Sequence, residues 1–492
     1  MPDLFVDRDR ERRALRDLLT IDGPTLALVY GRRRVGKTYL LTNSWPASRT
    51  FYFVAAESTG AVNRRELLAA IGRRFHLDLD PADFPTWRTV FRLLFGLASP
   101  KPLVVVLDEF QYLMGTGQGV PSHLSAVYDI HKDRRPFVVV LSGSAVRTME
   151  SLQAGDSPLY GRLAKTLRIK PFDYLDAAAL MPCEGLKECA TAYGIYGGTP
   201  RYLRSLRADR SLPENVAADV LSPGGQVRTQ VETVIDQERG LRDTEEYKAI
   251  LRAVGGGRTQ LNDIAMYVGL PNGTPLRKKL GRLVALGYVA AGRNFDARPK
   301  APFRYSLADP ALRFHATLVE RYRPELEKND ARDVWSAYIA REIDSYMGLV
   351  FERMVEQAYH RLRTRLKLPM IAEWSRWEGT DRTGASREVD IVARLTDGRM
   401  LTGAIKWGQL GLAVHQKHLR DLQALANSGH AWAREALRAK SPFLYATGRR
   451  FPANFRRRAE QDGHPVLAWT LEELYRGRRT PPAARRVRAR RK

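Results

Sequence analysis

A glycine-rich loop follows directly on a short apolar segment near the start of the chain. Residues 25–30 read TLALVY, and residues 31–38 read GRRRVGKT. The loop fits the pattern G-x-x-x-x-G-K-[ST], and it stands between a predicted buried strand and a helix predicted over about 37–43, which is the context that this pattern requires. The N-terminal part of the chain is therefore expected to be an α/β domain in which this loop surrounds phosphate groups.

Each residue type in the loop has a physical reason to be there. Glycine lets the backbone turn so that its N–H groups face the phosphates, and the helix that follows adds a partial positive charge at its N-terminus. We expect Lys37 to reach the β- and γ-phosphates of ATP and Thr38 to hold Mg²⁺. The predicted nucleotide-binding residues of the loop are Gly31, Arg32, Arg33, Arg34, Val35, Gly36, Lys37, Thr38 and Tyr39.

Three more apolar runs predict the rest of a sheet. They cover residues 51–56, 103–109 and 137–144, and helical patterns lie between them. Continuous apolar strands that alternate with helices indicate a parallel sheet covered on both faces. The first domain is expected to end near residue 205.

The strand predicted over 103–109 ends in two acidic residues, Asp108 and Glu109. A carboxylate at such a strand end can bind Mg²⁺ through water, and a second one can activate the attacking water. We assign Asp108 to the metal and Glu109 to the water as general base. The alternative is a pair of surface acids at the end of a strand.

Two further polar positions are catalytic candidates. Ser142 or Ser144, at the end of the strand predicted over 137–144, can hydrogen-bond the γ-phosphate or the attacking water; the alternative is a simple turn. Arg162, in SPLYGRLAK, can stabilise transition-state charge, either within its own chain or in a neighbouring subunit. For Arg162 the alternative is an ordinary solvated arginine.

The chain is strongly basic, with a net charge of +26 over 492 residues. Such a surplus of positive charge attracts nucleic acid by long-range electrostatics. The alternative is that the protein is simply rich in arginine throughout, which gives the same net charge. We expect DNA as a partner, with a protein partner or a second copy of the chain as further possibilities.

The cysteines and the apolar segments indicate the cellular compartment in which the protein is expected. Cys183 and Cys189 fit no zinc-binding spacing and do not support a disulfide framework. The first residues are charged and do not resemble a signal peptide. No apolar run approaches the length of about 20 residues that crosses a membrane. A cytoplasmic protein without a membrane partner is therefore expected.

The middle of the chain predicts three helices and a β-hairpin, in the order of a winged helix. The third helix, LRKKLGRLVALGYV, is the one that would enter a DNA groove. The alternative is that this domain packs on the ATPase core or a partner, and that its charges are solvated. The predicted DNA-binding residues are Arg277, Lys278, Lys279 and Arg282 on the third helix, and Arg298 and Lys300 on the wing.

The last part of the chain has the residue order of a PD-(D/E)xK nuclease. Glu352 lies on a predicted helix, Asp390 on a predicted strand and Lys406 on the next strand. In that chemistry carboxylates hold Mg²⁺ and the lysine assists the water. Ala404 stands where the motif needs an acid two residues before the lysine. We therefore expect the fold without cleavage; the alternatives are that Glu388 compensates, or that these are ordinary surface acids.

Taken together, these motifs resemble a known family, the prokaryotic or archaeal-type AAA+-like ATPases with a C-terminal DUF234 domain. The resemblance also rests on FVDRDRERRAL, YGGTPRYL, GLVFE and KWG. It implies ATP binding and hydrolysis. It also implies that Arg8 lies near the nucleotide, although Asp7 stands where the family usually has glycine.

The predicted architecture is an α/β P-loop core with a parallel sheet, a winged helix and a C-terminal restriction-endonuclease-like domain. The predicted boundaries are 1–205, 206–335 and 336–475, followed by a basic disordered tail at 476–492. The main functional hypothesis is an ATPase that couples nucleotide state to contact with DNA or a partner. The alternatives are a slow ATP-dependent DNA-binding switch and an ATP-gated, Mg²⁺-dependent nuclease.

Overall fold

The computed structural model describes residues 8–97, 102–115, 117–131, 137–238 and 241–477. The chain forms two compact units. Unit 1 contains Met1–Pro171 together with Asp236–Arg242, and unit 2 contains Phe172–Ile235 and Asp243–Lys492. The three domain boundaries expected from the sequence stay predictions, and the tail expected at 476–492 lies outside the described residues from 478 onward.

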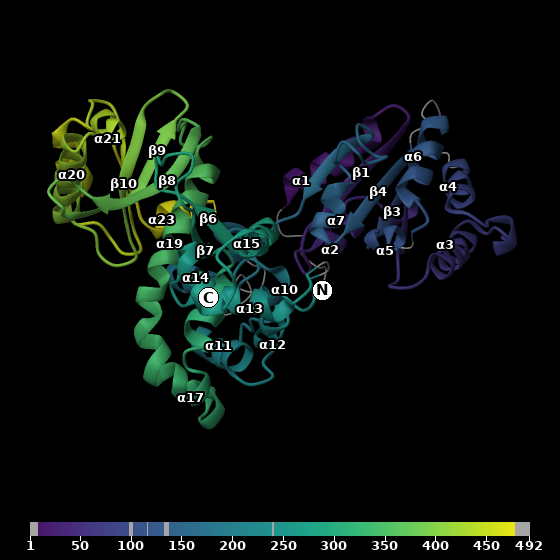
Figure 1. Cartoon of the computed structure of the whole chain (residues 1–492), viewed down its shortest axis with the longest axis horizontal. Coiled ribbons are helices and arrows are strands. Elements are labelled where there is room, and N and C mark those ends of the chain that lie inside the picture. Colours follow the sequence, from purple (N-terminus) through teal and green to yellow (C-terminus); the bar gives the residue numbers. More distant parts are fainter. Residues whose placement is uncertain (1–7, 98–101, 116, 132–136, 239–240, 478–492) are drawn as a thin grey trace, which may run out of the picture. The chain divides into compact units, whose positions relative to one another are not determined.

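Unit 1 is built on a five-stranded parallel sheet (Figure 1), as the sequence predicted. The strand order is β2-β3-β4-β1-β5, and all four pairings are parallel. The strands are β1 (Pro24–Tyr30), β2 (Thr50–Val54), β3 (Leu103–Asp108), β4 (Phe137–Gly143) and β5 (Leu163–Arg168).

The central strands of this sheet are apolar along their whole length because both faces are covered. Every residue of β1, β3 and β4 is buried. The strand β5 was not predicted, since its sequence LAKTLR is polar and partly exposed at the edge of the sheet. The helices of unit 1 are α1 (Asp9–Arg16), α2 (Lys37–Thr42), α3 (Gly60–Phe75), α4 (Trp87–Gly96), α5 (Gln111–Met114), α6 (Val120–His131) and α7 (Val146–Ser151).

Unit 2 begins with a series of helices and continues with three further helices and a hairpin. The hairpin pairs β6 (Val289–Gly292) with β7 (Arg304–Leu307) in antiparallel fashion. The three helices before it are α13 (Thr244–Gly255), α14 (Leu261–Val268) and α15 (Thr274–Leu286). The helices that precede them are α8 (Tyr174–Ala178), α9 (Leu186–Tyr196), α10 (Pro200–Leu203), α11 (Leu212–Val216) and α12 (Gln226–Glu232).

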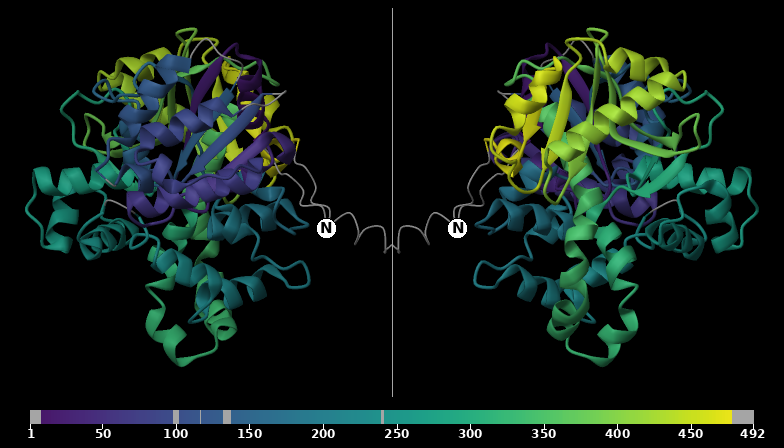
Figure 2. Two further views of the ribbon diagram at one scale, coloured as in Figure 1. Left: turned by 90° about the vertical axis from the view of Figure 1, so that its right-hand side faces the viewer. Right: turned by 90° about the vertical axis from the view of Figure 1, so that its left-hand side faces the viewer.

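The C-terminal part of unit 2 contains a mixed five-stranded sheet (Figure 2). Its order is β12-β11-β10-β9-β8; β8, β9 and β10 are antiparallel neighbours, whereas β10, β11 and β12 are parallel. The β9–β10 hairpin turns at Asp397-Gly398, a residue pair typical of such turns, with Gly398 at φ +85°. The strands are β8 (Ile371–Thr380), β9 (Ser386–Leu395), β10 (Met400–Lys406), β11 (Phe443–Thr447) and β12 (Val466–Trp469).

Helices before and after the strands pack on this sheet. The long helix α19 (Ala340–Leu362) and the helix α20 (Leu412–Asn427) both contact β10. The remaining helices of this region are α16 (Pro310–Phe314), α17 (Arg323–Lys328), α18 (Ala331–Val334), α21 (Ala431–Ala436), α22 (Phe455–Ala459) and α23 (Leu471–Leu474).

The loop between β6 and β7 is attached to the C-terminal sheet. Phe295 in this loop is 2% exposed and belongs to the same core cluster as Trp377 and Trp432. Its N–H donates to the carbonyl oxygen of Arg376 on β8 at 2.9 Å, and the Asn294 side chain donates to the carbonyl oxygen of Glu378 at 2.7 Å. Because β8 is an edge strand, this loop occupies backbone groups that would otherwise be open to another strand.

The two cysteines form a disulfide, which corrects the expectation from the sequence. Cys183 and Cys189 are joined with their Cα atoms 5.3 Å apart. Cys183 precedes α9 and Cys189 lies within it, so the turn into the helix brings the two side chains together. None of the helices described here has the length and apolar character needed to cross a lipid bilayer.

Candidate functional site

The loop Gly31–Thr38 joins β1 to α2 at the carboxyl end of the parallel sheet. Gly36 is at φ +90°, a conformation that side-chain-bearing residues rarely adopt. At Gly31 the backbone passes so close to Ile169 that a Cβ atom would overlap the carbonyl oxygen of that residue. Both glycines of the motif are therefore required by the local backbone, and the loop leads directly into the N-terminus of α2.

Lys37 lies inside the loop. Its side chain is 7% exposed, and its ammonium group donates to the carbonyl oxygens of Gly31 at 2.8 Å and Arg32 at 3.1 Å. Burial lowers the pKa of Lys37, while the negative charges of Glu109 and Asp108 act in the opposite direction. A buried ammonium group held by two carbonyl oxygens is well placed to neutralise a phosphate.

Asp108 is the centre of a group of oxygen atoms. The hydroxyl of Thr38 donates to its Oδ2 at 3.2 Å, and the hydroxyl of Tyr52 on β2 donates to the same oxygen. Burial, assisted by the charge of Asp108, raises the pKa of Tyr52, so this phenol stays a donor. A carboxylate and a hydroxyl next to each other are the hard oxygen ligands that Mg²⁺ prefers. Thr38 and Asp108 therefore fit a magnesium ion.

Glu109 is fixed by two side-chain donors. Its Oε2 accepts a hydrogen bond from the Ser144 hydroxyl at 2.8 Å and another from the side-chain amide of Gln111. Its backbone is at φ +52°, an uncommon conformation for a residue with a side chain. Such strained residues occur often at functional sites. The position of Glu109 is thus determined by β3, α5 and the end of β4.

Ser144, and not Ser142, is the serine that reaches this group. Ser142 is 0% exposed within β4, and its hydroxyl has no hydrogen-bond partner among the described residues.

The buried Arg8 donates to the carbonyl oxygens of Val35 at 2.9 Å and Lys170 at 2.7 Å, so it lies against the phosphate-binding loop.

Arg162 makes its contacts outside the group of residues around Lys37 and Asp108. It forms a bidentate pair with Asp129 on α6, with distances of 2.9 and 2.8 Å, and it also donates to the carbonyl oxygen of Pro158. This pairing neither supports nor contradicts a role in a neighbouring subunit. The role of Arg162 stays a prediction.

The structure thus brings Lys37, Thr38, Asp108, Glu109 and Ser144 together in the same region of unit 1. Sequence reasoning missed two residues that hold this group in place, Tyr52 and Gln111. Gln111 follows Glu109 by two positions, so proximity in sequence was an available signal. Tyr52 has no local signal, because its contact depends on β2 pairing with β3.

The six predicted DNA-binding cations fall into two classes. Arg277 and Lys278 on α15 are exposed, as are Arg298 and Lys300 in the β6–β7 loop. In contrast, Lys279 lies 2.9 Å from Glu246 and Arg282 donates to the hydroxyl of Tyr247 at 2.9 Å. Lys279 and Arg282 therefore connect α15 to α13, whereas the other four cations face solvent.

The three predicted nuclease-type residues lie near one another, on α19, in the middle of β9 and at the end of β10. The carboxylate of Asp390 accepts from the N–H of Ile405 at 2.8 Å and lies 3.4 Å from the Lys406 ammonium group. Burial and the charge of Asp390 raise the pKa of Glu352 on α19 to about 7. Glu388 pairs with Arg376 at 2.8 Å. Within the described ranges, no three His, Cys, Asp or Glu residues are grouped so that they could hold a metal ion.

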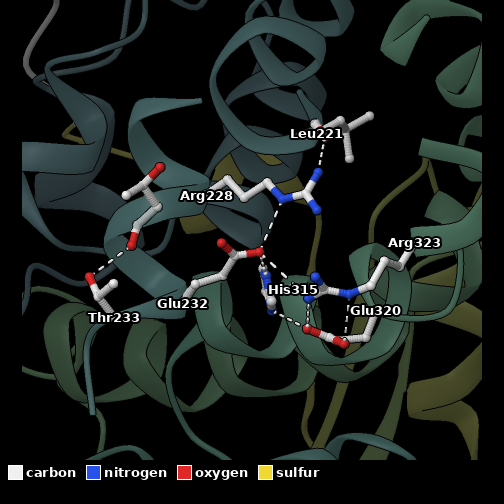
Figure 3. Close-up of polar contacts among 8 residues, drawn as sticks. Leu221, Arg228, Glu232, Thr233, His315, Glu320 and Arg323 are labelled. Atoms are coloured by element: carbon white, nitrogen blue, oxygen red, sulfur yellow. Dashed lines mark hydrogen bonds and ion pairs between the residues drawn. The ribbon is translucent and has the colours of Figure 1, made fainter. Parts of the chain in front are cut away.

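A second polar cluster in unit 2 surrounds His315 (Figure 3). Its Nε2 lies 3.4 Å from Glu232 and its Nδ1 lies 3.6 Å from Glu320. Arg228 pairs with Glu232 at 3.1 Å, and Arg323 pairs with Glu320 at 2.5 Å. The hydrogen bond from His315, followed by that from Arg228, lowers the pKa of Glu232 to about 2. Since these charges neutralise one another, we interpret the cluster as a connection between α12 and the segment around α16 and α17.

Comparison with known families confirms the resemblance inferred from the motifs. Residues 5–206 match the model of an ATPase domain that occurs predominantly in Archaea. Residues 315–419 match DUF234, a family described as archaeal and bacterial proteins of unknown function. The two matches occur in the order expected from the sequence.

The comparisons also found individual relatives. An uncharacterized protein, MJECL04 of Methanocaldococcus jannaschii, is 25% identical over 430 residues, which cover 85% of this chain and 91% of that protein. The Walker-type ATPase PABY2304 of Pyrococcus abyssi is 22% identical, with a TM-score of 0.46, over 64% of this chain and 96% of that one. The Aeropyrum pernix ORC2 protein, solved in ADPNP-ADP complexes, is 18% identical, with a TM-score of 0.45, over 68% and 96% of the two chains.

Proposed function

We propose that this chain, which joins an ATPase domain of the predominantly archaeal family to a DUF234 segment, binds ATP with Mg²⁺ and hydrolyses it. One observation carries the proposal. The Thr38 hydroxyl and the Asp108 carboxylate lie 3.2 Å apart in the region of the buried Lys37, and Glu109 is held there by Ser144. This is the set of groups that phosphoryl transfer to water requires.

Each residue has a separate role in this proposal. The main-chain N–H groups of the loop and Lys37 bind the phosphates, and Thr38 and Asp108 would hold Mg²⁺. When bound, Mg²⁺ neutralises charge on the phosphate oxygens. Glu109 accepts a proton from the attacking water, and Ser144 and Gln111 keep its carboxylate in position.

The test of this function is ATP binding and turnover in matched lysine variants. Lys37→Ala is expected to remove Mg²⁺-dependent turnover and to weaken ATP binding, because the phosphates lose their buried counter-charge. Lys165→Ala, on the exposed strand β5 of the same unit, is the control and should retain both. Normal turnover by Lys37→Ala would contradict the assignment of the loop.

Glu109→Gln separates catalysis from binding. The amide cannot act as a base, so turnover should fall by about 100-fold or more, whereas ATP affinity stays close to that of the wild type. Phosphate release and calorimetric titration measure the two quantities independently. Wild-type turnover by this variant would remove Glu109 from the proposed mechanism.

We further propose that the middle of unit 2 is a winged helix that contacts DNA. The exposed cations Arg277 and Lys278 on α15 support this, together with the net charge of +26. ATP turnover with and without duplex DNA tests whether the nucleotide and DNA sites are coupled. Cleavage is left out of the proposal because Ala404 occupies the position of the motif acid.

A further inference from the structure

An aromatic ring is exposed at the end of the loop between β6 and β7. Phe303, the last residue before β7, is 41% exposed, whereas Phe295 in the same loop is 2% exposed. A single exposed apolar side chain is common on protein surfaces. The neighbours of Phe303 therefore decide whether the ring has a binding role.

A guanidinium group lies on this ring. Gly292 and Arg304 form the last pair of the β6–β7 hairpin, so Arg293 and Phe303 face each other where the loop begins and ends. The Cζ atom of Arg293 is 3.9 Å from the centre of the Phe303 ring. Among the described residues no acid pairs with Arg293, and its Nε atom has no hydrogen-bond partner. The arginine side chain is thus held by the ring and keeps its charge unneutralised.

The backbone next to this pair is fixed to the strand β8. The Ser375 hydroxyl donates to the carbonyl oxygen of Arg293. The side chain of Asn294 donates to the carbonyl oxygen of Glu378 at 2.7 Å and accepts from the N–H of that residue at 3.3 Å. The Glu378 carboxylate is itself paired with Arg304. The ring and the guanidinium group are therefore ordered before any ligand arrives, which lowers the entropic cost of binding.

The sequence around the ring is strongly basic. Between residues 264 and 308 the chain has eight lysines and arginines and a single acidic residue, Asp296. Arg298 and Lys300, in the same loop as the ring, are exposed and form no ion pair with any residue that the structure describes. Unneutralised cations of this kind attract the phosphate groups of a nucleic acid.

A flat ring, a guanidinium plane and free cations together fit an unpaired DNA strand. Nucleobases stack on aromatic side chains and on guanidinium planes, and phosphates bind lysine and arginine. A base inside a duplex is already stacked on its neighbours, and taking it out costs free energy, whereas a single-stranded base is available at the lowest cost. The exposed ring is of most use for a strand whose bases are not paired.

We propose that Phe303 and Arg293 form a stacking site for an unpaired base of single-stranded DNA, and that Arg298 and Lys300 bind the phosphates beside it. This inference rests on the proposed contact of unit 2 with DNA and adds the form of DNA that the loop recognises. The helix α15, which packs on β6, keeps its separate role in contacting a duplex. The two surfaces together suit DNA in which a duplex continues into a single strand.

Fluorescence anisotropy with a labelled oligothymidylate and with a labelled duplex tests the site. Phe303→Ala should weaken binding to the oligothymidylate by about tenfold, the loss of one stacked base, and should change duplex affinity by less than about twofold. Phe303→Trp keeps a flat ring and should bind the single strand as the wild type does. Equal losses on the two forms of DNA, or no loss on the single strand, would overturn the proposal.

Tyr338→Ala is the matched control. This ring is exposed to a similar extent, 44%, but it lies 5.2 Å from the ring of Tyr322 and carries no arginine in the described structure. Its loss should change neither affinity. A loss of single-strand binding as large as that of Phe303→Ala would show that any exposed ring has this effect, and would overturn the assignment of the site.

The salt dependence separates stacking from charge. Phe303→Ala should leave the slope of log affinity against log salt unchanged on the oligothymidylate, because a phenyl ring releases no counterion. Lys300→Ala should reduce this slope by about 0.7, the value for one phosphate contact on a single strand. A changed slope for Phe303→Ala would contradict a stacking role.

The wild-type chain distinguishes this inference from the proposed function. A chain that binds duplex DNA and does not bind the oligothymidylate would overturn the stacking site and leave the proposed contact of α15 intact. A chain that binds neither form of DNA would contradict the proposed DNA contact itself.

Discussion

Two serines two positions apart at the end of β4 show how a single residue determines the site. The Ser144 hydroxyl donates to Glu109 at 2.8 Å, whereas the Ser142 hydroxyl is buried within the sheet and has no partner in the described structure. Adjacent strand residues point to opposite faces, but residues two apart share a face only while the strand continues. The strand ends at Gly143, so Ser144 is free to turn toward Glu109.

We predict a clear difference between the two serine variants. Ser144→Ala removes a hydrogen bond to a charged group, which is worth about 1.5 kcal/mol or more, so ATP turnover should fall by about tenfold. Ser142→Ala removes a hydroxyl that makes no hydrogen bond and should leave turnover unchanged. Steady-state phosphate release from both variants is the measurement. Similar turnover in the two variants would show that Ser144 does not position the general base.

His418 offers a prediction about pH. Burial, followed by the charge of His415, lowers the pKa of His418 to about 3, and its ring nitrogen Nδ1 shares a hydrogen bond with Tyr445 at 2.8 Å. The folded state keeps this histidine neutral, whereas the unfolded chain takes up a proton below about pH 6.5. The contribution of His418 to the free energy of unfolding is therefore fully present above pH 6.5 and is lost as the pH falls toward 3.

The expected size of the effect can be measured by urea unfolding. Between pH 7.5 and 5.5 the free energy of unfolding should fall by about 1.4 kcal/mol more in the wild type than in His418→Gln. Tryptophan fluorescence is sensitive to the C-terminal sheet, because two of the eight tryptophans, Trp432 and Trp377, lie in its core. An equal pH dependence in both proteins would show that His418 does not titrate differently in the folded and unfolded states.

At the level of elements, the β6–β7 loop is notable because it joins two parts of unit 2. The loop was predicted as a wing that presents Arg298 and Lys300 to DNA. Its other end inserts Phe295 into the core of the C-terminal sheet and bonds to the edge strand β8. The β6–β7 loop is thus fixed to the C-terminal sheet through Phe295 and exposes Arg298 and Lys300 to solvent.

Replacing Phe295, which attaches the β6–β7 loop to the C-terminal core, should destabilise unit 2. Phe295→Ala takes a phenyl ring out of a packed core and should lower the free energy of unfolding by about 3–5 kcal/mol. Phe303→Ala, in the same loop, is the control: that ring is 41% exposed, so its loss should cost less than about 1 kcal/mol. Chemical denaturation of the two variants gives both values. Equal losses would mean that the loop is not anchored through Phe295.

The elements that could be predicted are those with a strong local pattern. The apolar runs predicted β1, β2, β3 and β4, and the strands that carry Asp390 and Lys406 are β9 and β10. The strands β5 and β8 were not predicted, because they are polar or partly exposed and exist through pairing with distant strands. The short strands β11 and β12 also depend on such pairing.

The same limit applies to the candidate site. Recognisable local motifs contain Lys37, Thr38, Asp108 and Glu109. The order of these motifs and strands along the chain was therefore enough to predict that the four residues share one site. Tyr52 reaches Asp108 only because β2 lies beside β3, and Cys183 reaches Cys189 only through the turn before α9. Contacts that depend on three-dimensional neighbours have no signal in the local sequence.

For the molecule as a whole, the net charge of +26 predicts salt-sensitive binding to DNA. Lys278→Ala should reduce the slope of log affinity against log salt by about 1, since an exposed cation that contacts a phosphate releases about one counterion. Lys279→Ala should leave the slope unchanged, because that ammonium group is paired with Glu246. Fluorescence anisotropy with duplex DNA at several salt concentrations is the measurement. Equal slopes for the Lys278 variant and the wild type would argue against α15 as the contact.

The segment Asp236–Arg242, which belongs to unit 1, has a consequence for how the protein is made. A ribosome releases residues in order, and N-terminal domains usually fold as they emerge. Here the last piece of the ATPase unit, Asp236–Arg242, follows Phe172–Ile235, which belong to the other unit. Arg34 of the phosphate-binding loop donates to Gln237 at 2.7 Å, and it gains this partner only after Phe172–Ile235, the first part of the second unit, has been synthesised. A gene fragment that stops at Pro171 therefore encodes the loop without this contact.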